Sequence, residues 1–262
     1  MINRYAICYN PVLSYSKEAV NKLQSLLDKS KVEYYTFSLD DMKSGYDFIF
    51  VIGGDGTILK TARFYSKLDI PVFGINMGHL GFLSQACEDD LTNAVEQILK
   101  GNYKIEKRLM LKCGSTSALN DFVIKGADSS RAFKCSLEID SKFVCEYFSD
   151  GLIISTPTGS TAYGMSAGGP VLAPELQNLE IVPICPHTFS ARPLVISSDS
   201  VLKITVPDEQ KYYVCADGQD TFEFHKSITI SKENYCAKLA LLKNNDFYKV
   251  LRNKLHWGIT PC

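Results

Sequence analysis

An apolar run that leads without a spacer into an acidic, glycine-rich turn constrains this chain more than any other feature. The run is Phe48–Ile52, and the turn is the segment 53–57, of sequence GGDGT. A continuous β-branched and aromatic run of this length is typical of a strand that is covered on both faces. Apolar residues after the turn recur at helical spacing, so the turn is predicted to join a strand to a helix.

The turn has the residue types of a phosphate-binding site, with one exception. In open α/β sheets, ligands gather at the carboxyl ends of strands, where helix N-termini offer unpaired N–H groups to anions. Asp55 is the exception, because a carboxylate beside phosphates is repulsive unless it binds a metal ion or takes a proton from a hydroxyl. Both roles belong to phosphoryl transfer. The simpler interpretation is a tight turn with an acidic N-cap, and the pattern matches neither a G-x-G-x-x-G fingerprint nor a P-loop.

Composition excludes several classes of function. The chain has 262 residues, of which 45% are hydrophobic and 22% charged, and its formal net charge is -1. No overall basic field exists to hold nucleic acid or an anionic membrane, so any phosphate affinity has to be local. No apolar run approaches the roughly 20 residues of a membrane span, and we expect a cytoplasmic protein. The nine cysteines form no C-x-x-C pair, which favours reduced thiols over disulfides or zinc.

The first hundred residues alternate predicted strands and helices, which argues for a mostly parallel sheet. One helix is predicted to begin at a Ser16 cap, a second follows the glycine-rich turn, and a third ends near Gly101. A glycine-punctuated loop, residues 74–83, is expected to face the same strand ends as Asp55. The predicted strands are Tyr5–Tyr9, Val32–Phe37, Phe48–Ile52 and Pro71–Ile75.

From about Lys104 the period of the hydrophobic pattern changes from 3.6 residues to 2, which predicts a second, β-rich domain. Only Ser160–Ala167 looks helical within it, and the last 25 residues are predicted to turn helical again and to return to the first domain. The domains expected are 1–100 with 238–262, and 101–237. Alternating segments include 135–139, 201–206, 211–215 and 221–230.

A second polar constellation follows in the β-rich region. Asp150 precedes an apolar strand that ends in a hydroxyl-rich loop, of sequence STPTGSTAY at 155–163. Neutral hydroxyl and backbone donors can bind a diphosphate, and a carboxylate can accept two ribose hydroxyls. The simpler interpretation is a Ser/Thr-rich turn. A third polar pair, Asn120-Asp121, lies at the edge of an apolar strand and by itself indicates only a turn.

With these residues together, the sequence resembles the NAD kinases over nearly the whole chain. GGDGT alone is not specific, since diacylglycerol, sphingosine and phosphofructokinases carry similar acidic glycine turns. The TPTGSTAY segment distinguishes the NAD kinases from them. The matching segments are GGDGT at 53–57, GINMGHLGFL at 74–83, KRLML at 107–111, ALND at 118–121, DGLIISTPTGSTAY at 150–163, SAGGP at 166–170, CPHTFSARPL at 185–194, DGQ at 217–219 and LRNKLHWG at 251–258.

The resemblance implies an open α/β domain and an all-β, sandwich-like domain, in the superfamily of the diacylglycerol kinases and phosphofructokinases. It implies the reaction of ATP with NAD to give ADP and NADP, Mg²⁺ or another divalent cation held mainly by phosphates, and a homodimer or homotetramer. A lipid or sugar kinase and a non-catalytic dinucleotide-binding regulator remain alternatives. The chain shows no membrane-facing segment for the former, and the intact Asp55 argues against the latter.

Residue roles implied by the resemblance centre on the ribose hydroxyl. Asp55 activates the adenosine ribose 2′-hydroxyl, with Gly56 and Lys60 beside the dinucleotide. Asp150 meets a ribose or the nicotinamide amide, within the chain or across a subunit interface. The remaining NAD contacts implied are Asn120, Asp121, Arg131, Thr161, Ala162, Tyr163, Gly164, Met165, Ser166 and Gln219.

The chain departs from the family pattern at three positions. The family usually has Asn-Glu where this chain has Asn120-Asp121, which shortens the carboxylate by one methylene. Phe148 stands where many members have a basic residue, and Gly164 replaces a common Asn or Ser.

Overall fold

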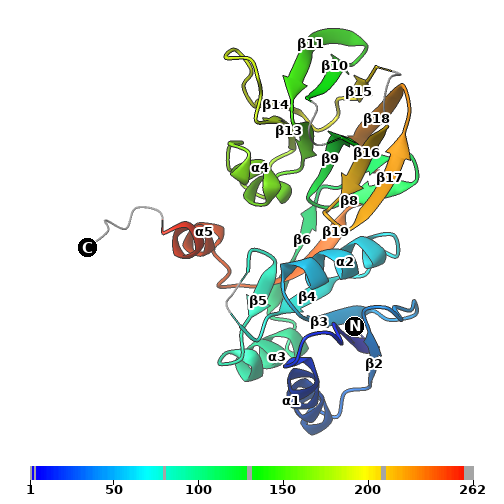
Figure 1. Cartoon of the computed structure of the whole chain (residues 1–262). Helices are drawn as coiled ribbons and strands as arrows, with labels where there is room; N and C mark the ends of the chain where they lie inside the picture. The colour runs from blue at the N-terminus through cyan, green and yellow to red at the C-terminus, as the bar shows by residue number, and fades with distance from the viewer. Residues whose placement is uncertain (1, 3, 79–80, 129–131, 208–210, 257–262) are drawn as a thin grey trace. The chain divides into compact units, whose positions relative to one another are not determined.

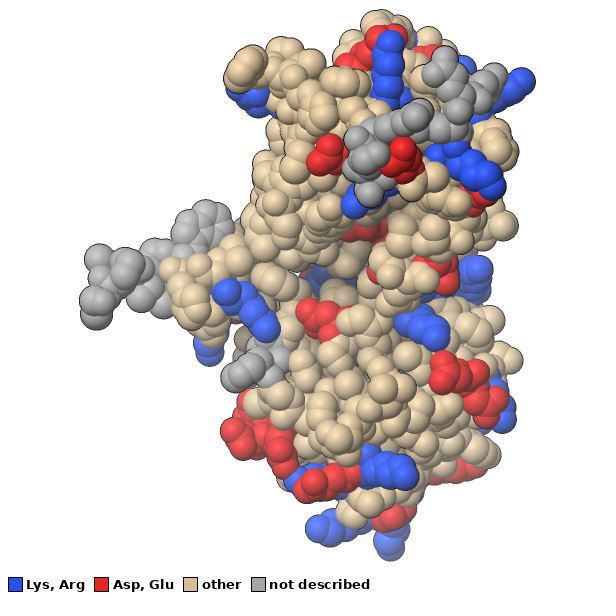
Figure 2. All heavy atoms as spheres, in the orientation of Figure 1, with Lys and Arg blue, Asp and Glu red and all other residues tan. Residues whose placement is uncertain are grey.

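The computed structural model describes residues 2, 4–78, 81–128, 132–207 and 211–256. The chain forms two compact units (Figure 1). The first consists of Met1–Lys107 with Ala237–Cys262, and the second of Arg108–Cys236. Figure 2 shows acidic and basic side chains interspersed on the face in view, in keeping with a net charge of -1. No described helix has the length and apolar content needed to cross a membrane.

The first unit is an open sheet with helices on both faces. Its strand order is β2-β1-β3-β4-β19-β6, with β5 paired to β4. The pairings of β1 with β2 and β3, and of β4 with β3, β5 and β19, are parallel. The strands are β1 Tyr5–Tyr9, β2 Tyr34–Ser38, β3 Phe48–Ile52, β4 Val72–Ile75, β5 Ser84–Ala86, β6 Tyr103–Arg108 and β19 Ala237–Leu242, and the helices are α1 Ser16–Lys29, α2 Asp55–Ser66, α3 Leu91–Leu99 and α5 Phe247–Leu255.

The sheet is buried on both faces, as the apolar run predicted. All five residues of β3 are buried. Side chains of α1 and α3 share one apolar cluster with alternate residues of β1, β3 and β4. Helix α2 packs against β3, β4 and β19, and its Thr61 hydroxyl lies 3.6 Å from the Cys8 sulfur of β1. The predicted parallel sheet is therefore confirmed, with β3 at its centre.

Two sequence predictions in this unit are wrong. Ser16 is not the cap of α1: the cap position is Tyr15, and Ser16 is the buried first helical residue. The segment that begins the predicted C-terminal helix instead forms strand β19, which lies between β4 and β6. A short apolar run such as Ala237–Leu242 fits a buried strand and a buried helix equally well by periodicity, and the open edge of β4 decides between them.

The second unit is a sandwich of two antiparallel sheets. The first has the order β11-β10-β15-β18-β7-β8, and the second β14-β13-β12-β9-β16-β17. One apolar cluster takes inward-facing residues from both sheets. The strands are β7 Leu111–Cys113, β8 Thr116–Ala118, β9 Asp121–Gly126, β10 Phe133–Ile139, β11 Lys142–Ser149, β12 Gly151–Ser155, β13 Asn178–Ile184, β14 Leu194–Ser197, β15 Leu202–Thr205, β16 Tyr212–Ala216, β17 Asp220–Phe224 and β18 Ser227–Lys232.

Two segments of this unit also differ from the sequence prediction. The segment 221–230 is not one strand, because a turn with Lys226 at a φ of 61° separates β17 from β18. The predicted helix Ser160–Ala167 is two short turns, a 3₁₀ turn at Gly159–Thr161 and the four-residue α4 at Tyr163–Ser166. Ala162 interrupts them with a φ of -101° and a ψ of -126°.

Candidate functional site

The acidic turn places Asp55 in the first turn of a helix at the carboxyl end of the central strand. Gly54 is the N-cap of α2, and Asp55 is its first residue. The Asp55 carboxylate accepts backbone N–H groups from the loop before β5: Phe82 donates to Oδ2 at 2.8 Å and Leu83 to Oδ1 at 3.2 Å. The two glycine-rich segments therefore meet at the same strand ends, as the sequence predicted.

Gly81 is required by the closeness of this contact. A Cβ on Gly81 would overlap the Asp55 carboxylate. The Gly81 N–H donates instead to the Ser84 hydroxyl, at 2.6 Å. Asp55 is half-buried, so its side chain is fixed by the loop and is still reached by solvent. A fixed and accessible carboxylate is suited to contact a ligand hydroxyl.

The neighbours of Asp55 on α2 face solvent. Gly56 is exposed in the first turn, and Lys60 is exposed one turn later. The Lys60 ammonium lies 3.5 Å from Asp40, in an ion pair whose partners are both largely exposed. Such pairs contribute at most about 1 kcal/mol, so a phosphate can readily replace Asp40 as the partner of Lys60.

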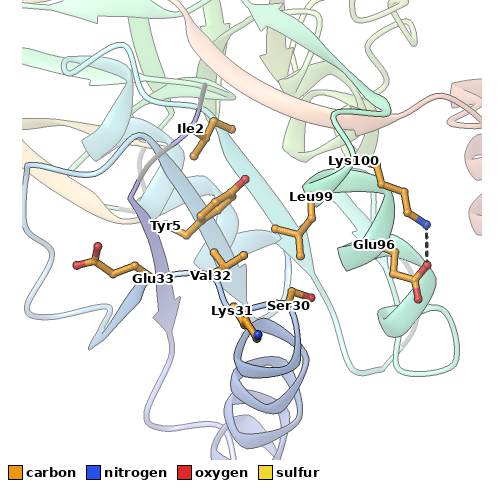
Figure 3. A pocket seen from close by; sticks show the side chains of 9 residues that line it. All are labelled: Ile2, Tyr5, Ser30, Lys31, Val32, Glu33, Glu96, Leu99 and Lys100. Atoms are coloured by element: carbon orange, nitrogen blue, oxygen red, sulfur yellow. Dashed lines mark hydrogen bonds and ion pairs between the residues drawn. The ribbon is translucent and has the colours of Figure 1, made fainter.

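A hollow in the first unit lies away from this chemistry. It has a volume of about 520 Å³ and is lined by the start of β1, the end of α1, the chain leading into β2 and the end of α3. Figure 3 shows Tyr5 and Leu99 beside it, with the Glu96–Lys100 ion pair at its rim. The lining residues from β1 and from the chain leading into β2 lie at the amino ends of these strands, whereas Asp55 follows the carboxyl end of β3. We therefore assign the site to Asp55 and its loop, and not to this hollow.

In the second unit, the Asp217 side chain fixes the backbone of the segment that carries Asn120 and Asp121. Its carboxylate accepts three backbone N–H groups, from Leu119 at 2.9 Å, Asn120 at 2.7 Å and Asp121 at 3.1 Å. Asp217 stands in the left-handed region, with a φ of 53°, in the turn after β16. Gln219 closes the same turn, because its N–H donates to the Ala216 carbonyl at 2.9 Å. Sequence reasoning gave Asp217 no role, although an Asp-Gly pair after a strand is a turn signal.

The hydroxyl-rich loop packs directly on this pair. The Thr156 N–H donates to the Asn120 carbonyl at 2.8 Å, and the Thr156 hydroxyl donates to the Leu119 carbonyl at 2.6 Å. A Cβ on Gly159 would overlap the Asn120 carbonyl, so this approach requires glycine. The structure therefore brings together the ALND, STPTG and DGQ segments, which lie far apart in the sequence.

The predicted NAD contacts at 161–166 follow on the two short turns after this loop. Gly164 is buried, Tyr163 and Ser166 are exposed, and the others are half-buried. The Tyr163 hydroxyl lies 3.4 Å from the Lys125 ammonium, which stands 5.4 Å from the centre of the tyrosine ring. The half-buried residues of this group are Thr161, Ala162 and Met165.

Asp150 lies at the start of β12 and is exposed. Its Oδ1 lies 3.3 Å from Nε2 of His187, and the His187 ring stands edge-on to Phe148, 4.8 Å between ring centres. The neighbour of Asp150 is thus a histidine held by Phe148, the residue found where the resemblance expects a basic side chain. Arg131, the remaining predicted contact, lies outside the described residues.

Two domain models and two relatives match this chain over most of its length. The model of the ATP-NAD kinase N-terminal domain matches residues 9–103, and that of the ATP-NAD kinase C-terminal domain matches residues 119–240. The chain belongs to the NAD kinase family. It is 42% identical over 245 residues to a NAD kinase of Clostridium botulinum (strain Loch Maree / Type A3), covering 89% of this chain and 87% of that one. It is 43% identical over 225 residues to a NAD kinase of Pseudomonas fluorescens (strain Pf0-1), covering 81% and 76%.

Solved structures agree with this NAD kinase assignment. An Archaeoglobus fulgidus NAD kinase, solved in complex with ATP, has a TM-score of 0.82 and 29% identity and covers 97% of this chain and 98% of its own. A yeast NADH kinase, solved with NADH, has a TM-score of 0.87 at 22% identity, covering 100% of this chain and 89% of its own, which shows the fold alone. The predicted family, fold class and NAD kinase function are confirmed, and the protein is a phosphotransferase.

Proposed function

We propose that this NAD kinase transfers the γ-phosphate of ATP to the 2′-hydroxyl of the adenosine ribose of NAD, giving NADP and ADP. The position of Asp55 is the observation that supports this most directly. Its carboxylate is fixed by the N–H groups of Phe82 and Leu83 at the end of β3, where ligands of open α/β sheets bind. Asp55 takes the hydroxyl proton as the new O–P bond forms and the bond to the leaving ADP oxygen breaks.

Asp55 has the capacity to act as this base. A carboxylate has about four lone-pair positions, and the loop amides occupy one on each oxygen. The others remain for the ribose hydroxyl. Because a hydroxyl has a pKa far above 7, a positioned base contributes about 10² to 10⁴ in rate. Gly56 and Lys60, exposed on the same helix, lie beside the dinucleotide in this proposal.

Magnesium enters this reaction as part of the Mg·ATP substrate. Within the described ranges of the chain, no group of three or more His, Cys, Asp or Glu side chains converges in a way that could hold a metal ion. The residues in these ranges therefore offer no ligand set for a metal ion of their own. Mg²⁺ prefers oxygen ligands and can be coordinated by phosphate oxygens and water. This preference is consistent with its binding as a complex with ATP.

The second unit supplies the contacts to adenosine and to the second ribose. Asn120 and Asp121 meet a ribose and the adenine, on a loop fixed by Asp217. Asp150 meets a ribose or the nicotinamide amide. Neutral donors suit this task because they discriminate hydroxyls without adding net charge. Residues proposed to line the adenosine pocket are Thr161, Ala162, Tyr163, Gly164, Met165 and Ser166, with Gln219 nearby.

A product assay tests the proposal. The purified protein is incubated with NAD, ATP and Mg²⁺, and the phosphate position in the product is read by NMR. We expect NADP phosphorylated at the 2′ position, in amounts that match the ADP released. ADP without NADP, or phosphate on another hydroxyl, would contradict the proposal. Replacing ATP by other nucleoside triphosphates or polyphosphate, and NAD by NADH, defines the donor and acceptor ranges.

We also propose that the protein acts as a homodimer or homotetramer. Strand β11 is an edge strand with large exposed side chains: Phe143 is 67% and Phe148 46% exposed. A paired edge avoids aggregation, and a symmetric partner is the usual way to pair one. Phe148 also holds His187 beside Asp150, so covering this surface would affect Asp150.

Dilution of the enzyme tests the link between assembly and activity. We expect specific activity and NAD binding to fall together as the oligomer, followed by light scattering, dissociates. A fully active monomer would show that Asp150 acts within its own chain.

A further inference from the structure

Three polar side chains lie in one row across the second sheet of the sandwich. Ser155 on β12 pairs directly with Asp121 on β9 and with Glu180 on β13. Residues directly opposite one another in antiparallel strands project from the same face. Asp217 extends the row, because its N–H donates to the Asp121 carbonyl at 2.9 Å. Glu180 is the carboxyl group of this row that the proposed mechanism does not use.

The row faces the loop that carries the proposed adenosine contacts, and not the main core. Two residues further along the same strands, Val123, Ile153 and Val182 form a small apolar cluster with Ala167 from that loop. Glu180 lies directly beneath the loop: a Cβ on Gly164 would overlap its Oε1, and one on Gly169 would lie 3.3 Å away. The Glu180 carboxyl group therefore packs directly against the Gly164–Gly169 turn.

The surroundings of Glu180 disfavour its charged form. The residue is fully buried, and neither carboxylate oxygen has a hydrogen-bond partner of good geometry among the described residues. Burial and the Asp121 carboxylate raise the pKa of Glu180 to about 7, and the Ser155 hydroxyl lowers it only in part. Burial and the Asp217 carboxylate raise the pKa of Asp121 to about 7 as well. Two such carboxyls titrate as a pair.

We propose that Glu180 is a positioning residue of the dinucleotide site, which holds a proton beneath the Gly164–Gly169 turn so that Asp121 carries the single negative charge of the pair. The inference rests on the proposed roles of Asp121 and of the adenosine-pocket residues. In this arrangement Asp121 accepts a hydrogen bond from the ligand, while the neutral Glu180 leaves the turn above it undisturbed. Asp217, at the end of the row, accepts three backbone N–H groups.

The charged and titratable groups around Glu180 are few. Strands β12 and β14 contain none, and β13 contains only Glu180 itself. Strand β9 contributes Asp121 and Lys125, and α4 contributes Tyr163, which is in contact with Lys125. Proton loss from Glu180 therefore places a second negative charge beside Asp121. Arg108, a buried cation of the same unit, donates to the Thr158 hydroxyl at 3.3 Å.

This arrangement predicts that NAD affinity is highest near pH 7. Below that pH, Asp121 becomes protonated and loses its capacity to accept a hydrogen bond from the ligand. Above it, Glu180 ionises, and repulsion from Asp121 disturbs the turn. Replacing Glu180 by the neutral isostere Gln therefore removes the loss of NAD affinity above pH 7 and leaves the loss below pH 7 unchanged.

The experiment compares the dissociation constant for NAD, without ATP, in the parent and in Glu180→Gln across pH 5.5 to 9. Glu138→Gln, at a half-buried glutamate of β10 paired with Lys203, is the control. We expect the constant to rise at least about fivefold from pH 7 to 9 in the parent and control and to stay level in Glu180→Gln. The acid-side rise persists in all three, and the control keeps the parent's kcat at pH 7 and saturating NAD within about twofold. Parallel pH profiles for parent and Glu180→Gln would overturn the proposal.

Infrared spectroscopy of the ligand-free protein keeps this test independent of the proposed function. In the parent we expect a protonated-carboxyl stretch that is lost on titration through pH 7 to 8. In Glu180→Gln we expect a weaker band at pH 6.5, because only the Asp121 carboxyl remains to contribute to it. A missing band would overturn the inference even if the enzyme makes NADP. Conversely, if the infrared band is present but the protein does not bind NAD, the proposed ligand contacts are wrong. The positioning role of Glu180 in the dinucleotide site is then wrong as well.

Discussion

The two units of this molecule each contain a carboxyl group that matters for the site, and the two groups differ in burial and in the number of hydrogen-bond donors around them. Asp55, in the first unit, is half-buried, and each of its oxygens accepts a backbone N–H. Glu180, in the second, is fully buried, and its oxygens have no well-formed partner among the described residues. Donors aimed at a carboxylate favour its charged form, whereas burial without donors favours the protonated form.

The difference shows how one chemical group can serve two tasks. A base must be ionised and must reach its substrate, which needs donors on one side and an open approach on the other. A group that supports a loop from below is best neutral, because an unpaired charge at that depth is costly. Asp217 resembles Asp55, since three backbone N–H groups hold it. The predictions below change each kind of carboxylate in turn.

The largest effect is expected for Asp55→Asn. The amide cannot act as a base, and we expect turnover to fall by at least about 10². Its NH₂ group also has to face the N–H of Phe82 or Leu83, so the loop loses a hydrogen bond that a carboxylate makes. Steady-state kinetics at saturating NAD measures the loss. Asp69→Asn, at the other end of α2, is the control and should leave turnover unchanged. Near-normal turnover in Asp55→Asn would remove Asp55 from catalysis.

Asp217→Asn should weaken NAD binding more than it slows chemistry. The change replaces one acceptor oxygen by a donor that faces the N–H of Leu119 or of Asn120, so the loop carrying Asn120 shifts. Losing a charge-assisted hydrogen bond and opposing two donors costs about 2 to 3 kcal/mol, so the KM for NAD should rise roughly 30- to 100-fold. The exposed Asp199→Asn is the control. An unchanged KM would show that this loop does not contact the dinucleotide.

A smaller effect is expected for Asp150→Ala, because its carboxylate is more than half exposed. If it bonds to ligand hydroxyls, its removal should raise the KM for NAD roughly 10- to 30-fold, with kcat little changed. His187→Ala removes only the neighbour of Asp150 and serves as a comparison. Equal KM values for Asp150→Ala and the parent would show that Asp150 does not touch the dinucleotide.

The last prediction concerns the free energy of unfolding, and not NAD binding or turnover. The pKa of Glu180 lies at about 7 in the folded protein, against 4.5 ordinarily, so the folded state binds the extra proton between these values. Stability is then lost as the pH rises from about 5 to about 7, and the loss levels off above. Relative to Glu180→Gln, the parent should lose about 3 kcal/mol of unfolding free energy over this window, since each unit of pKa difference is worth about 1.4 kcal/mol. Urea unfolding at several pH values measures this, and an equal slope in both proteins would contradict it.

Much of the fold could be read from the sequence because its patterns are strong. Phe48–Ile52 was predicted as a buried strand and is one to the residue, since a short run of β-branched and aromatic side chains that ends at a glycine turn favours a strand. The alternation in Phe133–Ile139 likewise gave an antiparallel strand with a turn after it. The joining of Asp55 to the loop 81–83 followed from the rule that parallel strands end on one edge.

Other elements were mispredicted where local pattern was ambiguous. Ala237–Leu242 forms a strand because it pairs with the edge of β4. Strand β4 lies far away in the sequence, so the local pattern cannot reveal this pairing. Ser160–Ala167 could not remain one helix, because the loop has to pack closely on Asn120 and Glu180. The departure at Gly164, where the resemblance expects Asn or Ser, has the same origin: a side chain there would meet the Glu180 carboxylate.

The sequence by itself determined the family, the two kinds of domain and the position of Asp55, because motifs and periodicity are local in the chain. Tertiary structure alone decided the role of Glu180. In the sequence, Glu180 is one polar residue inside the apolar strand Asn178–Ile184. Only the register of β9, β12 and β13 places it in a row with Asp121 and beneath Gly164. Ionisation depends on burial and on neighbouring charge, and both are set by residues distant in sequence.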